Sequence, residues 1–150
     1  MKVGLKMAEN HPYRYFSTVS ERRVDWLWYP YIPYGKITVL QGDPGEGKST
    51  FMINLAAAIS CGSQVPFGKR ANGKSETVIY QCAEDSLEDT IKPRLLRAGA
   101  DCSRVAYIDD QEQSLTLDDT RLEDTIQATG ARLLVLDPIQ AFIGPECDFQ

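Results

Sequence analysis

Several features that would indicate a secreted, membrane or metal-binding protein are missing from this 150-residue sequence. No apolar run approaches the roughly 20 residues that a membrane-spanning helix needs, and residues 1–6 lack the apolar stretch of a signal peptide. The cysteines form no C-x-x-C pair, so we expect buried free thiols rather than a zinc site or a disulfide framework at Cys61, Cys82, Cys102 and Cys147. These absences lead us to expect a cytoplasmic protein without membrane contact.

Histidine and positive charge are also scarce. The single histidine, His11, lies in a polar stretch next to a proline, where we expect an exposed side chain rather than a ligand or a base. With 16 basic and 21 acidic residues, the net charge is −5. A dedicated duplex-DNA-binding domain usually has a basic surface. Any contact with nucleic acid would therefore depend on a local patch, an assembled ring or a further domain.

A glycine-rich segment is the most informative feature that is present. It fits G-x-x-x-x-G-K-[ST], the pattern of a phosphate-binding P-loop, and it reads Gly42-Asp43-Pro44-Gly45-Glu46-Gly47-Lys48-Ser49. Glycines let backbone N–H groups turn toward phosphate oxygens, and the dipole of the next helix favours the same anions. We therefore expect residues 42–50, up to Thr50, to bind ATP, with Lys48 on the phosphates and Ser49 on Mg²⁺.

The surroundings of this loop match a strand–loop–helix unit. A short apolar strand is predicted at 36–40 directly before it, and a helix at 50–60 directly after it. The remaining predicted elements are strands at 76–82, 104–108 and 132–137, a helix after Ser86 that Pro93 kinks or restarts, and a helix at 117–129. Alternation of strands and helices, with nearly continuous apolar strands, indicates a mostly parallel sheet covered on both faces, an α/β fold.

The segment before the loop divides into two parts. Residues 1–24 are polar and mixed, and we expect a peripheral arm or a short helix. Residues 25–35 are dense in aromatic side chains. Such rings can stack on nucleic-acid bases, but we favour the alternative that they cover the edge of the sheet, because aromatic rings bury large areas wherever a core is near.

Two acidic positions complete the predicted site. Asp137 ends an apolar strand in the Walker B pattern, so we expect it on the Mg²⁺ side of a bound nucleotide. Pro138 follows it, in the place where many P-loop ATPases carry a catalytic glutamate. We assign that role to Glu84, after the strand at 76–82, because carboxyl ends of parallel strands converge on a ligand. Asp85 is instead expected to favour the following helix N-terminus electrostatically, and this alternative stays open for Glu84 too.

Four segments together resemble the RecA-like ATPases, and most closely the RepA-type replicative helicases, which are often described as AAA family ATPases. The resemblance covers about residues 25–145 and rests on Ile32-Pro33-Tyr34-Gly35-Lys36, the P-loop, Ala83-Glu84-Asp85-Ser86 and Leu136-Asp137-Pro138. It implies Mg²⁺-dependent ATP hydrolysis coupled to DNA or to a partner protein, with Lys48 and Glu84 as catalytic residues and Asp137 at the metal. It also implies a hexamer-type homo-oligomer, through whose ring single-stranded DNA would be bound. It leaves the role of Arg94, near an arginine common in these proteins, open.

The same resemblance implies a three-layer αβα fold with further strands after the Walker B strand. One of them would lie between the P-loop strand and the Walker B strand, so we expect a partial RecA-like domain at 25–150 with its C-terminal strands missing and a gap in the sheet. Three functions stay open: an ATP-hydrolysing motor domain, a truncated nucleotide-binding and oligomerisation module with little turnover, and, as the weakest, a small-molecule kinase.

Overall fold

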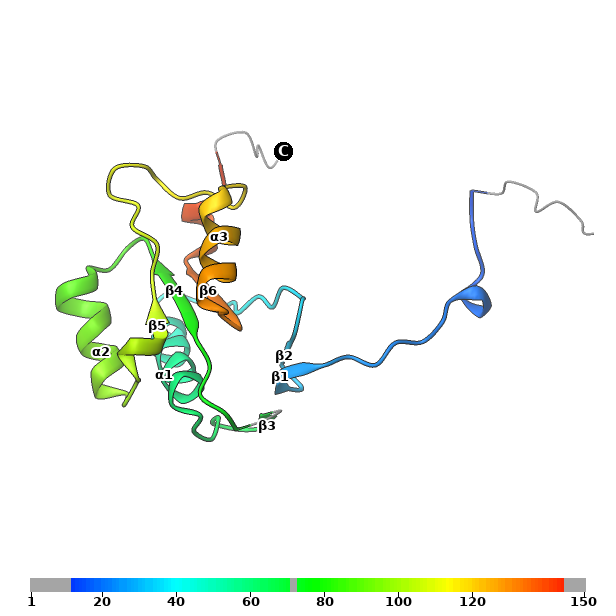
Figure 1. Cartoon of the computed structure of the whole chain (residues 1–150), viewed down its shortest axis with the longest axis horizontal. Helices are drawn as coiled ribbons and strands as arrows, with labels where there is room; N and C mark the ends of the chain where they lie inside the picture. The colour runs from blue at the N-terminus through cyan, green and yellow to red at the C-terminus, as the bar shows by residue number, and fades with distance from the viewer. Residues whose placement is uncertain (1–11, 71–72, 145–150) are drawn as a thin grey trace, which may run out of the picture.

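The structure is a computed structural model that describes residues 12–70 and 73–144 (Figure 1). The expectations for His11 and Cys147 lie outside the described residues. Two three-stranded sheets are present in the described part of the chain, one with the strand order β5-β4-β6 and one with the order β2-β1-β3.

The first sheet is parallel and has β4 (Val78–Cys82) at its centre. It pairs on one side with β5 (Val105–Ala106) and on the other with β6 (Leu133–Asp137), in a register that sets Val78 opposite Leu133 and Cys82 opposite Asp137. The predicted parallel α/β arrangement is thereby confirmed, although β4 and β5 are shorter than the apolar runs suggested.

The two faces of this sheet carry separate hydrophobic clusters. Val78, Tyr80 and Val135 pack with buried residues of α1 (Lys48–Cys61) and α2 (Lys92–Arg97) on one face. On the other face, Leu134 and Leu136 pack against a cluster that includes Leu122 of α3 (Thr120–Thr129) and Phe142 of the short helix η4 (Ile139–Phe142). Helical segments therefore cover both faces, as Figure 1 shows for α1 and α3 around β4 and β6.

The helix ends follow the local signals in the sequence. Ser86 caps η2, a π-helical turn (Leu87–Ile91), by accepting a hydrogen bond from the Asp89 N–H. Pro93 stands in the first turn of α2, where the π-helical turn changes directly into an α-helix without a break. In α3, the Asp119 side chain accepts from the Arg121 N–H, so the helix begins at Thr120 rather than at the expected residue 117.

The predicted strand at 36–40 is wrong. Residues 37–40 have no regular structure, and Ile37, Val39 and Leu40 are 86%, 70% and 47% exposed. In the described residues, β6 pairs with β4 alone, so no neighbouring strand offers its backbone to this segment. Because a buried strand must satisfy its N–H and C=O groups through neighbours, an apolar sequence by itself does not make one.

The aromatic segment forms the second, antiparallel sheet. β1 (Trp26–Tyr29) pairs with β2 (Ile32–Pro33) and with β3 (Lys69–Arg70). The Trp28 ring is 2% exposed, contacts Phe51 of α1 and Phe67, and donates a hydrogen bond to the Phe67 carbonyl. These rings cover the flank of α1, whereas Tyr29 and Tyr31 stay about half exposed.

Three cysteines lie in the described residues, and all three are free thiols. Cys61 is exposed and Cys82 and Cys102 are partly buried, so the expectation of buried thiols is wrong for these three.

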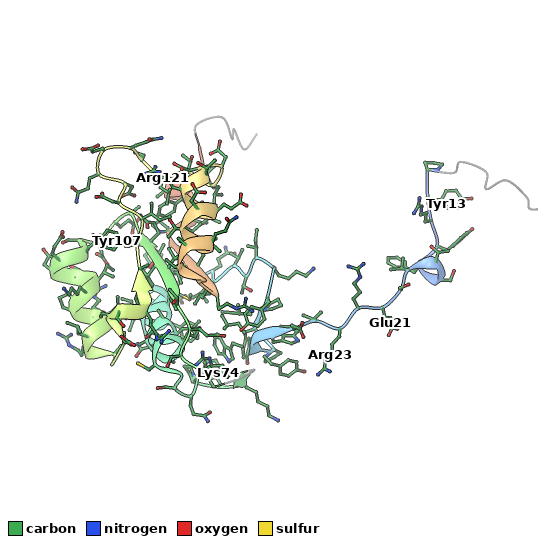
Figure 2. All side chains as sticks on the ribbon, viewed as in Figure 1. Tyr13, Glu21, Arg23, Lys74, Tyr107 and Arg121 are labelled. Atoms are coloured by element: carbon green, nitrogen blue, oxygen red, sulfur yellow. The ribbon has the colours of Figure 1, made fainter. Side chains whose placement is uncertain are left out.

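The segment from residue 12 to β1 is extended, with one 3-10 turn, η1 (Phe16–Thr18). Seen from β1, it runs away from the sheets past Arg23, Glu21 and Tyr13 (Figure 2). A last 3-10 turn, η3 (Cys102–Arg104), leads into β5. Among the described residues, no helix combines the length and apolarity needed to cross a bilayer.

Candidate functional site

The glycine-rich loop makes a sharp turn immediately before α1. Gly45 and Gly47 adopt φ angles of +83° and +84°, a left-handed conformation in which a side chain would strain the backbone. Asp43 and Glu46 close the turn through a backbone hydrogen bond of 3.3 Å. The whole segment 42–47, Pro44 included, is exposed, and Ser49 is half-buried at the start of α1. The loop therefore opens to solvent with its glycines where the turn requires them.

Two charged side chains, those of Lys48 and Glu46, form hydrogen bonds with backbone groups of the loop. The Lys48 ammonium donates to the carbonyl oxygens of Gly42 and Asp43, at 2.8 and 2.7 Å. The Glu46 carboxylate accepts from the Asp43 N–H at 2.8 Å, and a side chain at Gly42 would collide with it. A carboxylate oxygen on a loop amide is the kind of contact that a phosphate oxygen makes. The loop thus holds one anionic oxygen, that of its own Glu46, with a lysine at its rim.

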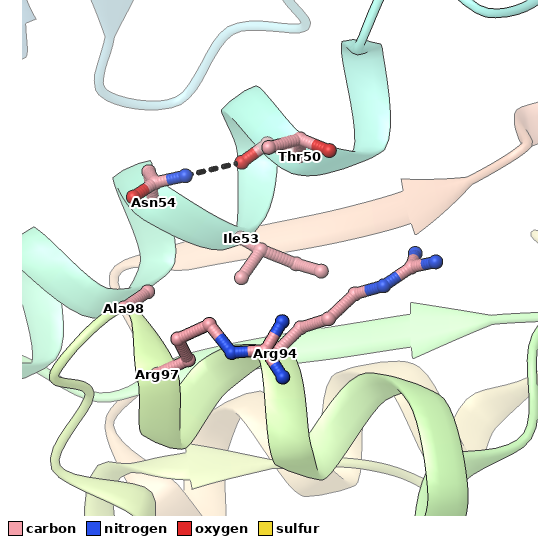
Figure 3. Close-up of a pocket in the computed structure, with 6 residues that line it drawn as sticks. All are labelled: Thr50, Ile53, Asn54, Arg94, Arg97 and Ala98. Carbon is pink, nitrogen blue, oxygen red and sulfur yellow. Dashed lines mark hydrogen bonds between the residues drawn. The ribbon is translucent and has the colours of Figure 1, made fainter.

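Helix α1 points its first turn toward the carboxyl ends of the strands. At its other end, the Ile59 carbonyl accepts from the Glu76 N–H, just before β4 begins, at 3.0 Å. The helix packs along β4 and β6, and in Figure 3 Thr50 lies at the end of α1 toward which the strand arrows point. Because α1 has 14 residues and β4 has five, the helix spans the strand's full length. Lys48 and Ser49 therefore lie in the turn of α1 that is nearest the edge of the sheet where ligands bind in α/β folds.

Asp137 lies at that same edge and on the same face of the sheet. It is the last residue of β6. Since side chains alternate along a strand, Asp137 shares a face with Leu133 and Val135, which pack in the cluster that contains α1. In the described structure, no hydrogen bond joins Ser49 and Asp137 directly. What the fold provides is a common edge and a common face for the serine, the lysine and this carboxylate.

The acidic segment after β4 is fixed beside Asp137. The Ala83 N–H donates to the Asp137 carbonyl at 3.1 Å, which continues the strand pairing by one step. Asp85 forms an ion pair with Arg94 at 3.0 Å, whereas the Glu84 side chain is exposed. The role that the sequence left open for Arg94 is thus, in part, to hold Asp85.

A pocket of about 240 Å³ lies between α1 and α2 next to this edge. Its lining is shown in Figure 3 and consists of Thr50, Ile53, Asn54, Arg94, Arg97 and Ala98. The Arg94 guanidinium extends in the direction of the strand arrows, toward the edge that carries Asp137 (Figure 3). Positive charge therefore stands beside the P-loop helix as well as on the loop.

Two neighbouring residues of β4 belong to the site region although the sequence analysis did not single them out. The Tyr80 hydroxyl donates to the Asp137 Oδ2 at 3.2 Å. Burial, and then the negative Asp137, raise the pKa of Tyr80 well above its usual value, so it stays a protonated donor. The Gln81 amide exchanges two 3.0 Å hydrogen bonds with the backbone of Ile108 and extends the contact of β4 with the chain after β5. A polar residue inside an apolar strand was the available signal for Gln81.

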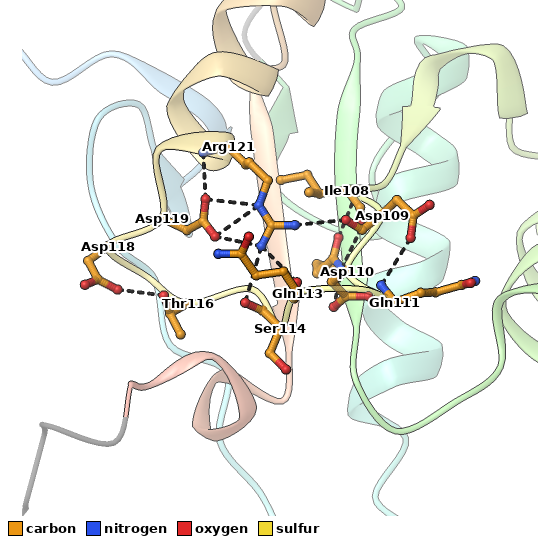
Figure 4. A network of polar contacts seen from close by, with 11 residues as sticks. Ile108, Asp109, Asp110, Gln111, Gln113, Ser114, Thr116, Asp118, Asp119 and Arg121 are labelled. Atoms are coloured by element: carbon orange, nitrogen blue, oxygen red, sulfur yellow. Dashed lines mark hydrogen bonds and ion pairs between the residues drawn. The ribbon is translucent and has the colours of Figure 1, made fainter.

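The loop after β5 is held by one arginine (Figure 4). The Arg121 guanidinium donates to the backbone carbonyls of Asp109 and Gln113 at 3.0 and 2.9 Å, and pairs with the Asp119 carboxylate at 2.7 Å. Hydrogen bonds from Arg121 lower the pKa of Asp119 below its ordinary value. This network accounts for Asp119 as a structural acid rather than a site residue.

The donors near Asp137 suit a magnesium ion better than a transition metal. Mg²⁺ takes hard oxygen ligands and is usually bound by one or two carboxylates together with substrate phosphates and water. Ser49 and Asp137 offer oxygens of this kind. Among residues 12–70 and 73–144, no three His, Cys, Asp or Glu side chains form a protein cage for a metal. The residues present fit a metal ion that shares its ligands with a phosphate.

Comparison with known proteins shows a match to a protein family. A family model described as "AAA domain" matches residues 14–148, which is nearly the whole chain. No curated protein and no solved structure matches the chain.

Proposed function

Because this chain belongs to the AAA domain family, we propose that it binds and hydrolyses ATP with Mg²⁺ as the ATPase domain of a RepA- or RecA-like DNA helicase or recombination-type ATPase. Family membership indicates a nucleotide-binding ATPase. The observation that carries the finer proposal is the position of Asp137, at the same edge and on the same face of the sheet as the first turn of α1. Partners in this proposal are ATP and ADP, single-stranded DNA and further copies of the chain in a ring.

The loop and the first turn of α1 bind the phosphates. Backbone N–H groups of the loop, all but that of Pro44, which has none, surround the phosphate oxygens after Glu46 leaves the Asp43 amide. The flexible Lys48 side chain exchanges the Gly42 and Asp43 carbonyls for the β- and γ-phosphates. Ser49 and Asp137 would hold Mg²⁺, which would neutralise phosphate charge.

Glu84 orients and deprotonates the attacking water in this proposal. Two carboxylates follow β4, and only one of them is held in an ion pair, because Arg94 binds Asp85. The exposed Glu84 lies one residue after Ala83, whose N–H is hydrogen-bonded to the Asp137 backbone. Its carboxylate is therefore placed, in this proposal, next to the strand end that carries Asp137 and available to a water molecule.

A second function has an observation of its own in its favour. The segment before the loop, residues 37–40, is irregular and exposed instead of anchored in the sheet. Catalysis requires the loop to be held rigidly against the acids. A module that binds nucleotide and assembles, with little or no turnover, is the alternative. A small-molecule kinase has no such support.

Glu84→Gln separates these two functions. We expect nucleotide affinity within a factor of about two of the unchanged protein, while ATP turnover falls by roughly 10²–10⁴, the usual contribution of a general base. Glu88→Gln is the matched control and should leave turnover unchanged. Glu88 is also an exposed acid, and it lies nearby in η2. Turnover is measured as phosphate release, and affinity with a fluorescent ATP analogue.

The possible outcomes are distinct. Binding without turnover in the unchanged protein supports the module, and equal turnover in Glu84→Gln rejects Glu84 as the base. No nucleotide binding at all rejects both functions. The helicase or recombinase assignment is tested by phosphate release with and without single-stranded DNA, with the oligomeric state measured in the same sample. If single-stranded DNA leaves the turnover of an assembled ring unchanged, the helicase or recombinase assignment is contradicted.

A further inference from the structure

Tyr80 is a buried residue whose polar atom reaches the acid of the proposed metal site. The side chain is 1% exposed, and its hydroxyl lies 3.2 Å from the Asp137 Oδ2. We propose that Tyr80 is a positioning residue that holds the Asp137 carboxylate in the orientation needed for the divalent metal bound with the nucleotide. This inference rests on the proposed function and adds to it the group that orients the metal-side acid.

The strand register explains how the two residues meet. Tyr80 lies opposite Val135 in the parallel pairing of β4 and β6, and both side chains face the cluster that contains α1. Asp137 is two residues further along β6 on the same face. A tyrosine leans along its strand and is long enough to cover that diagonal, which a shorter side chain at the same position would not cover.

Packing alone does not account for a tyrosine here. A phenylalanine ring would fill the same volume without a hydroxyl that must find a partner once it is buried. The partner in this structure is the carboxylate that ends β6. Within residues 12–70 and 73–144, no hydrogen bond reaches the other oxygen, Oδ1, so the contact fixes one oxygen of Asp137 and leaves the second for the metal or its water.

The main chain of Asp137 is also held, by the residue that directly follows β4. Its carbonyl accepts from the Ala83 N–H at 3.1 Å, while Tyr80 of β4 holds its side chain. Backbone and carboxylate are thereby fixed from one short stretch of chain. Hydrogen-bonded partners of this kind around ligating carboxylates orient the ligand, and their loss typically costs 10–100-fold in metal affinity or activity.

Tyr80→Phe tests the inference, because it removes one oxygen atom and keeps the ring. We expect the Mg²⁺ concentration for half-maximal binding of a fluorescent ATP analogue to rise by about 10-fold or more. Nucleotide affinity measured in EDTA should change by less than about twofold, since the loop and Lys48 are untouched. Tyr107→Phe is the matched control: Tyr107 is 56% exposed, and its substitution should leave the Mg²⁺ midpoint unchanged.

Two further variants separate positioning from stability. Val135→Ala removes buried volume beside Tyr80 without touching the hydrogen bond. It should lower the thermal midpoint of unfolding more than Tyr80→Phe does and leave the Mg²⁺ midpoint in place. In an Asp137→Asn background, Tyr80→Phe should add no further shift, because the group through which it acts is gone.

The outcomes distinguish this inference from the function on which it rests. If the unchanged protein binds nucleotide in a Mg²⁺-dependent way and Tyr80→Phe has the same Mg²⁺ midpoint, the positioning role is rejected and the proposed function stands. A shift that persists in full in the Asp137→Asn background also rejects it. If the unchanged protein binds no nucleotide, the proposed function fails and the inference fails with it.

Discussion

Asp119 performs two structural tasks at the level of a single residue. Its carboxylate caps α3 by accepting from the Arg121 N–H, and it pairs with the Arg121 guanidinium, which in turn holds the loop after β5 through backbone carbonyls. Removing the carboxylate therefore loosens a helix end and a loop together. Because Arg121 favours the ionised form, the pKa of Asp119 is lowered from its ordinary 3.8.

This shift predicts an acid-dependent loss of stability. A lowered folded-state pKa contributes stability that is fully present above the unfolded value and is lost as the pH falls through the folded value. We expect Asp119→Asn to reduce the free energy of unfolding at neutral pH, and the difference from the unchanged protein to shrink below about pH 4. Urea unfolding across this range measures it. Asp124→Asn, an exposed acid of α3, is the control, and an Asp119→Asn difference independent of pH would contradict the argument.

At the scale of elements, a valine-to-alanine substitution should affect stability very differently in the segment at 37–40 and in strand β4. Val39 is 70% exposed, whereas Val78 is fully buried at 0%. Val39→Ala should change the free energy of unfolding by less than about 0.5 kcal/mol. Val78→Ala should cost about 2 kcal/mol, because it leaves a cavity in the cluster below α1.

Urea unfolding of both variants provides the measurement. Hydrogen exchange adds an independent one, since amides of residues 37–40 should exchange much faster than those of β4. Equal costs at the two valines, or equal protection, would mean that residues 37–40 form a paired strand in solution.

Comparing the segment at 36–40 with the elements that did form shows which parts of the fold were predictable from the sequence. Three features depend on local patterns and were found where the sequence placed them. An apolar run predicted β6, a glycine-rich turn predicted the start of α1, and a serine before a helix predicted the Ser86 cap. The segment at 36–40 is also rich in apolar residues, but a strand needs a neighbour as well. Pairing partners are a property of the whole chain and leave no local mark.

The candidate site divides in a similar way. The glycines of the loop follow from its motif, and the left-handed φ angles of Gly45 and Gly47 agree with it. The roles of Lys48, Ser49, Glu84 and Asp137 stay predictions that the geometry supports. Tyr80 could not be found from its own neighbourhood, because its contact with Asp137 depends on the register between two strands that are far apart in the sequence.

At the scale of the whole molecule, the proposed ligand would add contacts between the exposed loop and the acidic edge of the parallel sheet. The loop at 42–47 is exposed, whereas β4 and β6 carry the acidic edge. A nucleotide held by the loop and by a metal on Asp137 would bridge these parts. Ligand that binds only the folded protein stabilises all of it, by about 2.7 kcal/mol at a concentration of 100 times the dissociation constant.

For a chain of this length, such a gain corresponds to a rise of roughly 5–10 °C in the thermal midpoint. We expect that rise with ATP and Mg²⁺, measured by circular dichroism at saturating nucleotide. AMP is the matched control, because it keeps the base and the ribose but lacks the β- and γ-phosphates that Lys48 is proposed to bind. Lys48→Ala should remove most of the rise with ATP. An equal rise with AMP, or a full rise in Lys48→Ala, would place the main binding energy outside the loop and would contradict the proposed phosphate site.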